Sequence, residues 1–242
     1  MLTGCASDRL APQINRAAVE VLHRNGIAVV EVAGQGCCGA LAHHGGAPAE
    51  AAALARSNSA AFAAVEVDFV VTTAAGCTAH MRDYPRLSGG EPRATWVGEH
   101  TREICELLVE TGFESPAVLL DERVAYHDAC HLAHACGIRE PPRTVVQAAT
   151  GRRPIDLGEN EICCGSAGSY NLDRPRLAKA LGLRKAKLAE SIDVDTIAAG
   201  NAGCLLQIEK ALSLRGLALR TVHPVDLLAA AYRASEANDS SS

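Results

Sequence analysis

The chain has 242 residues, of which 48% are hydrophobic and 21% charged, and its formal net charge is −5. This composition excludes a disordered chain and supplies enough apolar side chains for one large or two modest domains. The acidic balance and the aromatic content of 3% argue against nucleic acid as a partner. The sequence contains no apolar run that could span a bilayer and no secretory signal at its start, so we expect a cytoplasmic protein that is at most peripheral on the inner face of a membrane.

Short runs of β-branched residues alternate with longer helical patterns along the chain. In chain order the pattern predicts a strand, a helix, a strand, a helix, a helix and a strand, at residues 27–32, 49–65, 67–71, 100–110, 175–191 and 196–199. A turn-rich stretch at residues 111–116 separates the two halves. This alternation predicts an α/β fold in which a mainly parallel sheet is flanked by helices.

The ten cysteines reveal a duplication. Eight of them recur in two sets of four, which are Cys5, Cys37, Cys38 and Cys77 in the first half and Cys130, Cys163, Cys164 and Cys204 in the second. Gaps of 32 and 39 residues in the first set become 33 and 40 in the second. The sequence therefore predicts two tandem copies of one module, at residues 1–115 and 116–242.

Glycines and prolines recur in step with the cysteines. Gly26 and Gly151 each follow the first cysteine of their set by 21 residues, where a left-handed glycine ends a helix. Pro48 and Pro175 follow the paired cysteines and suit the first turn of a helix. Further on, His100 and its neighbours match His223 loosely.

The vicinal cysteines must lie in turns, because successive side chains of a strand point to opposite faces. The glycine after each pair, Gly39 or Gly165, gives the backbone the freedom to turn both sulfurs toward one centre. We place the cysteines at the carboxyl ends of the strands, the edge of an open α/β sheet where separate segments converge on a ligand.

Four thiolates per module are the ligand set of a [4Fe-4S] cluster or of a tetrahedral zinc site. Iron is favoured because the ligands are widely spread instead of forming two C-x2-C knuckles. Small residues beside them can also bring backbone N–H groups to cluster sulfurs, namely Gly76, Ser166, Ala167, Gly168 and Ser169. We therefore expect one [4Fe-4S] cluster per module, with zinc in one or both as the alternative.

The remaining candidates are weaker. Cys105 and Cys136 have no counterpart in the other copy and are left outside the site, Cys105 as a core residue. His127 and His131 flank Cys130 and can act as hydrogen-bond donors or ligands, although core or surface roles are commoner. The adjacent histidines at positions 43 and 44 are predicted to lie in a solvated loop.

Five longer motifs resemble the cysteine-rich CCG-domain family. They are Leu-Thr-Gly-Cys at 2–5, Ala-Ala-Gly-Cys at 74–77, Tyr-His-Asp-Ala-Cys-His-Leu-Ala-His at 126–134, Ile-Cys-Cys-Gly-Ser-Ala-Gly-Ser-Tyr-Asn at 162–171 and Asn-Ala-Gly-Cys-Leu-Leu-Gln at 201–207. This family includes the heterodisulfide reductase B subunit, lactate-utilisation iron-sulfur proteins and the glycolate oxidase iron-sulfur subunit, and the last is the most similar. The resemblance implies a non-catalytic subunit that relays electrons to a quinone or other acceptor. Their source would be a flavin on partner dehydrogenase subunits that oxidise glycolate to glyoxylate.

Two departures from the family pattern refine this expectation. The heterodisulfide reductase branch has a Cys-x-x-Cys at the last cysteine, where this chain has His80 and Gln207, which favours the glycolate branch. The family's glycolate subunit also carries an N-terminal ferredoxin-like domain with two C-x2-C-x2-C-x3-C-P runs, and none is present here. We therefore expect the C-terminal part of a longer or split protein, with a separate ferredoxin-like subunit as a further partner.

Three alternatives remain open on the sequence. One is a zinc-stabilised structural or scaffolding module, and another is a thiol-disulfide enzyme that uses the vicinal cysteines. The third is a lactate-utilisation or heterodisulfide-reductase-like subunit. The sequence contains no Gly-x-Ser-x-Gly, Walker A or His-Glu-x-x-His motif, so the resemblance and the motifs agree on a chain without substrate chemistry of its own.

Overall fold

The computed structural model describes residues 1–160 and 162–239. The first half contains, in order, α1 (Cys5–Leu10), α2 (Pro12–Arg24), α3 (Ala40–His44), α4 (Pro48–Ala63), β1 (Val70–Thr72), α5 (Ala75–Arg82), α6 (Tyr84–Leu87), α7 (Pro92–His100), β2 (Thr101–Glu103) and α8 (Ile104–Thr111). The second half contains β3 (Val124–Tyr126), the π-helix η1 (His131–Ala135), α9 (Glu140–Thr150), β4 (Ile155–Asp156), α10 (Tyr170–Asp173), α11 (Pro175–Glu190), β5 (Thr196–Ala198), α12 (Ala202–Leu214), β6 (Arg220–Val222) and α13 (Pro224–Asp239).

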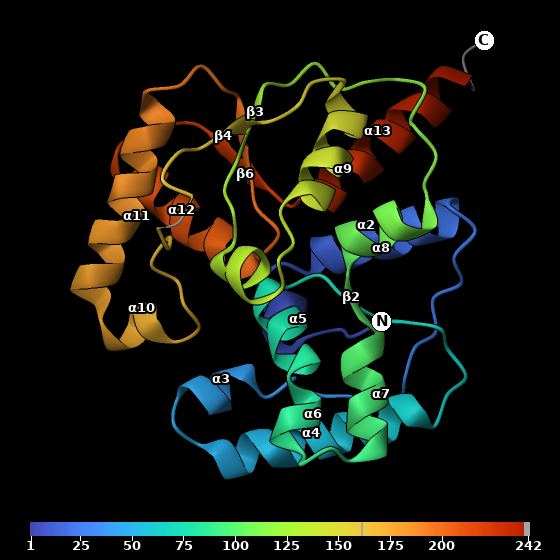
Figure 1. The fold of residues 1–242 in the computed structure, drawn as a ribbon. Coiled ribbons are helices and arrows are strands. Elements are labelled where there is room, and N and C mark those ends of the chain that lie inside the picture. The colour runs from blue at the N-terminus through green and yellow to red at the C-terminus, as the bar shows by residue number, and fades with distance from the viewer. Residues whose placement is uncertain (161, 240–242) are drawn as a thin grey trace.

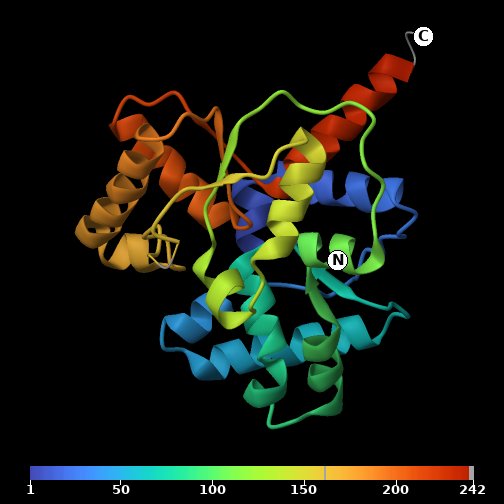
Figure 2. The same cartoon turned by 45° about the horizontal axis from the view of Figure 1, so that its top comes forward.

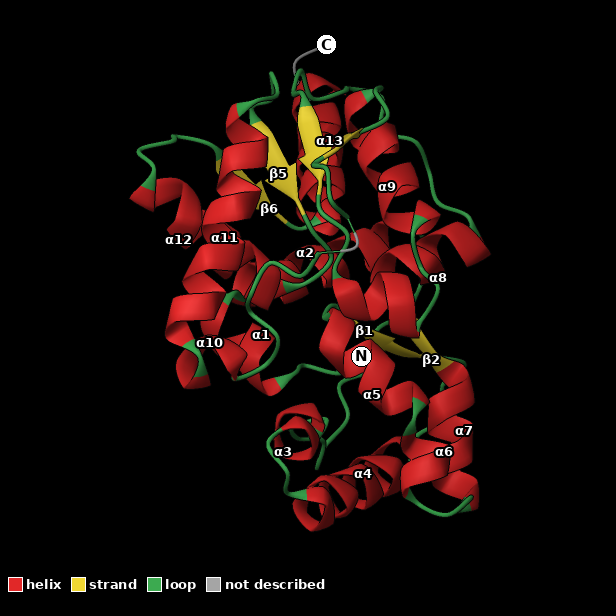
Figure 3. Ribbon diagram, turned by 60° about the vertical axis from the view of Figure 1, so that its left-hand side comes forward, coloured by secondary structure: helices red, strands yellow, loops and turns green. Residues whose placement is uncertain are grey.

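All strand pairs in the described residues are parallel, and helices flank them (Figure 3). The second half holds a four-stranded sheet of order β4-β3-β5-β6, with Ala125 opposite both Ile155 and Ile197. The first half holds the pair β1-β2, with Val71 opposite Arg102. The predicted α/β class with parallel sheets, built from two repeats, is confirmed.

Among the described residues, the first half lacks strands at the positions of β4 and β3, which are neighbours at one side of the four-stranded sheet. The predicted strand at residues 27–32 is wrong, because this segment joins no strand pair among the described residues. The counterpart of β3 is the segment 1–3, which makes single hydrogen bonds to either side, from Leu2 N–H to the Val71 carbonyl (2.8 Å) and from the Met1 amino group to the Val30 carbonyl (3.3 Å). One bond on each side is too few to set up a ladder.

The helix signals in the sequence predict the helix ends well. Pro48 and Pro175 start α4 and α11. Gly26 and Gly151 follow α2 and α9 with φ of 72° and 70°, the left-handed conformation expected of them. The predicted helix at 100–110 is wrong at its start, because residues 101–103 pair with β1 as β2 and α8 begins only at Ile104.

The two halves share a core. One apolar cluster contains side chains of α2 and α8 together with side chains of α9, α12 and α13. In Figures 1 and 2, α2 and α8 lie beside α9 and α13, and α13 packs against both α2 and α9. The predicted boundary at 111–116 falls in the segment between α8 and β3, and the division into two domains stays a prediction. Within the described residues, no helix is both long and apolar enough to cross a bilayer.

Candidate metal centre

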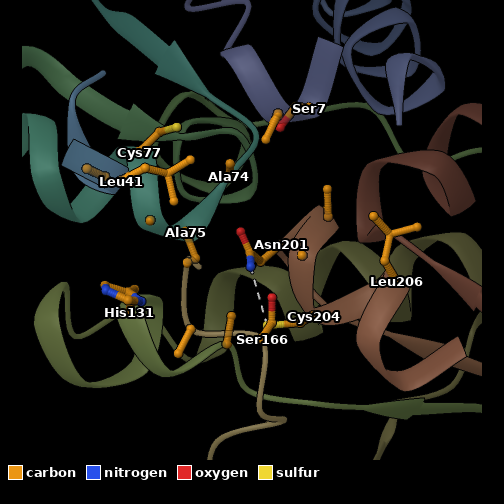
Figure 4. Close-up of a pocket in the computed structure, with 18 of the residues that line it drawn as sticks. Ser7, Leu41, Ala74, Ala75, Cys77, His131, Ser166, Asn201, Cys204 and Leu206 are labelled. Carbon is orange, nitrogen blue, oxygen red and sulfur yellow. Dashed lines mark hydrogen bonds between the residues drawn. The ribbon is translucent and has the colours of Figure 1, made fainter. Parts of the chain in front are cut away.

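All eight repeated cysteines line one cavity of about 360 Å³ between the two halves. Figure 4 shows this cavity with Cys77 from the first set and Cys204 from the second. Cys77 and Cys204 lie in the first turns of α5 and α12, which directly follow β1 and β5. The other cysteines lie at or before the starts of short helices beyond the sheet edges. The fold therefore gathers both sets at the carboxyl ends of the strands, as the sequence predicts.

The first set forms a row of touching thiols. The Sγ atoms of Cys5 and Cys37 are 3.3 Å apart, and so are those of Cys38 and Cys77. The backbone N–H of Gly39 donates to the Cys37 sulfur at 3.5 Å. The four sulfurs thus lie next to one another, although they come from α1, α5 and the turn before α3.

The second set repeats this arrangement. Cys163 contacts Cys130 and Cys164, and Cys164 also contacts Cys204. The N–H of Gly165 donates to the Cys163 sulfur at 3.3 Å, as Gly39 does in the first set. All ten cysteines of the chain are free thiols.

Each cysteine pair is followed by a glycine in the left-handed conformation with little or no room for a side chain. Gly39 and Gly165 have φ of 94° and 96°. A Cβ at Gly165 would lie 2.5 Å from the Ala178 carbonyl oxygen of α11, and one at Gly39 would lie 3.1 Å from the Ala51 oxygen of α4. The positive φ and the close helix backbone both require glycine.

Buried polar side chains fix the turn of the first set. Asn58 accepts from the Gly36 N–H (2.8 Å) and donates to the Cys37 carbonyl (2.9 Å). The Tyr84 hydroxyl donates to the Cys38 carbonyl at 2.7 Å. In the second half, the Lys185 ammonium of α11 instead holds carbonyls of the segment that leads to its turn.

Crowding shapes the acidity of the thiols. Burial, and then the contact with Cys37, raise the pKa of Cys5 above the ordinary thiol value. In the second set, the contact with Cys130 and then that with Cys164 lower the pKa of Cys163, while the contact with Cys163 raises the pKa of Cys130. Neighbouring sulfurs therefore share protons, because they cannot all ionise side by side. A bound metal cation removes this conflict, since it takes the place of the protons. The donor set fits a thiolate-bound metal centre in each half.

Comparison with known protein families matches residues 1–82 and 124–209 to CCG, the cysteine-rich domain. The chain belongs to this family. One CCG segment lies in each half, so the duplication predicted from the cysteine spacing is confirmed.

The chain is also similar to several curated proteins. It is 32% identical over 234 residues to the probable glycolate oxidase iron-sulfur subunit of Bacillus subtilis, covering 93% of this chain and 53% of that protein. It is 34% identical over 218 residues to the glycolate oxidase iron-sulfur subunit of Escherichia coli, covering 87% and 53%. It is 27% identical over 229 residues to lactate utilization protein A of Oceanobacillus iheyensis, covering 93% of both. The chain thus spans about half the length of the glycolate oxidase subunits.

Some residues considered from the sequence lie away from the cavity that the eight cysteines line, here called the CCG cavity. Cys105 is fully buried in the shared core, and Cys136 does not line the cavity.

His80 is buried under the turn at residues 37–39, with its Nε2 3.2 Å from the position that a Cβ at Gly39 would take. Gln207 Nε2 donates to the Ala178 carbonyl at 2.8 Å. Neither residue at the second position of the family's Cys-x-x-Cys therefore lines the cavity.

The histidines divide between the cavity and the interior. The predicted solvated loop is wrong, because His43 and His44 form the last residues of α3. His44 and His131 line the CCG cavity, and the His131 Nδ1 lies 3.7 Å from the Cys130 sulfur. His127 is only 1% exposed. One of its ring nitrogens and the sulfurs of Cys164 and Cys204 lie within 4.8 Å of one another.

Sequence reasoning missed two kinds of residue. Asn201 donates its side-chain N–H to the Cys204 sulfur at 3.4 Å (Figure 4). The repeat concealed it, because the equivalent residue of the first module is Ala74. Asn58 and Tyr84 were missed because each acts on the turn from a distant helix. The ligand role of the eight cysteines stays a prediction.

Proposed function

We propose that the protein is an iron-sulfur electron-transfer subunit of a 2-hydroxy-acid dehydrogenase complex, with glycolate as the substrate class of that complex. The observation that carries the proposal is the convergence of two complete four-thiol sets on one cavity. Electrons would come from a flavin on partner subunits and leave to a quinone or another acceptor. The names of the relatives support the iron-sulfur and glycolate assignments.

Each CCG module would hold one [4Fe-4S] cluster through its own set of cysteines. Such a cluster takes up and releases single electrons. The protein's part is to exclude other ligands and to aim N–H groups at the sulfurs, as Gly39 and Gly165 do. The concentration of free thiols suits a reducing compartment, which supports a cytoplasmic location.

Lactate is the second substrate candidate. The chain covers lactate utilization protein A almost from end to end, whereas it covers only half of the glycolate oxidase subunits. The name of this relative supports a partner complex that oxidises lactate as the alternative. The two candidates share the same role for this chain and differ only in the partner.

The test is anaerobic reduction of the purified protein by a flavin-containing glycolate dehydrogenase subunit. The loss of visible absorbance measures the reduction. We expect bleaching with glycolate or lactate that requires the flavin subunit, and none with the substrate alone. The variant Cys38→Ser/Cys164→Ser, which removes a buried thiol from each set, should lose the response. A protein that contains iron-sulfur clusters but is not reduced under any of these conditions would refute the proposed relay.

A further inference from the structure

The two CCG modules place different side chains at one equivalent position. The N–H of Leu2 donates to the Val71 carbonyl, and the N–H of His127 donates to the Ala198 carbonyl, both at 2.8 Å. Each residue stands three positions before the first cysteine of its set. The backbone is therefore matched, and only the side chain changes from leucine to histidine.

At a second equivalent position, too, the first module has an apolar side chain and the second module has a polar one. Ala74 and Asn201 both stand three residues before the last cysteine, and both are the extended residue that precedes a helix, α5 or α12. Asn201 Nδ2 donates to the Cys204 sulfur at 3.4 Å, and Figure 4 shows both Asn201 and Ala74 facing the cavity. Alanine offers Cys77 no such donor.

The imidazole of His127 needs a partner that the second sulfur set can supply. It is almost fully buried, and neither ring nitrogen has a hydrogen-bond partner in the described part of the chain. Leaving a buried polar group unpaired is costly. The sulfurs of Cys164 and Cys204 lie within 4.8 Å of a ring nitrogen of His127. A thiolate that binds metal has no proton to donate, so it acts as the acceptor and the ring acts as the donor.

We propose that His127 and Asn201 hold the centre of the second module at a higher reduction potential than that of the first module. N–H donors to cluster sulfurs stabilise the reduced state, because it carries the larger negative charge. Both modules have a glycine N–H donor, and among the described residues the second module adds the Asn201 amide and, in this proposal, the His127 ring. One electron then passes from the reduced first centre, which is oxidised, to the oxidised second centre, which is reduced, with no bond made or broken. This inference rests on the proposed iron-sulfur function.

The test is a redox titration of the anaerobic protein, followed by EPR, with iron measured in every sample. The variants are His127→Leu and Asn201→Ala. They place in the second module the side chains that the first module has at Leu2 and Ala74. Asn171→Ala is the control, because Asn171 lines the same cavity but its side chain makes no bond to a sulfur among the described contacts. A Cys5→Ser variant, which disables the first set, identifies the signal of the second centre.

We expect the wild type to show two transitions, with that of the second centre at the higher potential. Each variant should shift this transition to lower potential at unchanged iron content. The potential of the first centre should not change, and neither potential should change in the Asn171→Ala protein. Unmoved potentials in an iron-loaded Asn201→Ala protein would overturn the inference, and so would equal shifts of both transitions. If His127→Leu loses iron, Asn201→Ala decides alone, since its side chain is only half-buried. A wild type without iron would instead sink the proposed function.

Discussion

Single glycines decide whether each cysteine pair can face its centre. The sequence predicts the need for Gly39 and Gly165 from the vicinal cysteines alone, and both adopt the positive φ that this reasoning requires. The sequence does not predict that Gly165 also lies against the backbone of α11, because that contact depends on how the helix packs over the turn. The same limit applies to Asn201, whose contact with Cys204 breaks the repeat from which the other site residues were inferred.

Gly165→Ala should empty the second centre and leave the first one intact. The added methyl group would meet the Ala178 carbonyl oxygen at 2.5 Å, so the turn must move and carry Cys163 and Cys164 with it. Iron per chain should fall by about half, since one of two [4Fe-4S] sites is lost. Iron analysis and EPR measure this outcome.

Gly216→Ala is the matched control. Gly216 has a similar positive φ of 70°, but a Cβ there would meet nothing within 4 Å. Its cost should be the backbone strain alone, about 1 kcal/mol, with full iron content. Equal iron content in the two variants would show that the close approach of α11 does not matter.

At the scale of elements, the two modules use equivalent helices to hold their turns by different chemistry. Asn58 of α4 pairs with backbone on both sides of the Cys37 turn, whereas Lys185 of α11 binds the Gly158 and Glu159 carbonyls. The sequence predicts both helices and their starting prolines, because length and composition define them. It does not predict these buried polar contacts, since Asn58 and Lys185 are residue types commonly found on exposed faces.

Asn58→Ala should destabilise the first module strongly. Asn58 is 1% exposed and bonds to the Gly36 N–H, the Cys37 carbonyl and the Tyr84 hydroxyl. Removing it leaves buried backbone groups unpaired, at a cost of about 3 kcal/mol. Urea unfolding measures the change in the free energy of unfolding.

Ser57→Ala is the control on the same helix, because Ser57 is exposed. It should change the free energy of unfolding by less than about 0.5 kcal/mol. A similar loss for both variants would mean that α4 is weakened in general and that Asn58 has no special role at the turn.

At the scale of the whole molecule, a buried acid of the first half lies close to a buried imidazole of the second half, and each stands directly before a helix, α8 or α13. Glu103 accepts from backbone N–H groups at the start of α8, and His223 Nδ1 accepts from the Val225 N–H at the start of α13. Both side chains are fully buried, with Glu103 Oε1 and His223 Nε2 3.9 Å apart. The equivalence of Glu103 with His223 replaces the loose sequence match of His100, which instead stacks on Trp96. The sequence could not predict this, because the two helices meet only after the modules pack together.

Glu103 should make the protein less stable as the pH rises. Burial raises the pKa of Glu103 to about 8 from 4.5, so between these values the folded chain holds a proton that the unfolded chain has lost. Burial lowers the pKa of His223 to about 3 from 6.5, so its effect is opposite and ends near pH 6.5. The free energy of unfolding should therefore fall between about pH 6.5 and 8, by about 2 kcal/mol.

Glu103→Gln, which keeps an oxygen that can accept the helix N–H groups, should remove this decline. Urea unfolding of both proteins at a series of pH values gives the comparison. The stability of the variant relative to the wild type should rise with pH over this range. A constant difference between the two curves would show that Glu103 is ionised in the folded protein.

The central claim is that each half gathers four thiolates around an iron-sulfur centre, and metal and sulfide analysis of the anaerobically purified protein tests it most directly. Two [4Fe-4S] clusters predict about eight iron and eight sulfide ions per chain, with EPR signals on reduction. The Cys38→Ser and Cys164→Ser variants should each lose about half of both. Stoichiometric zinc without sulfide and without a reducible signal would contradict the account.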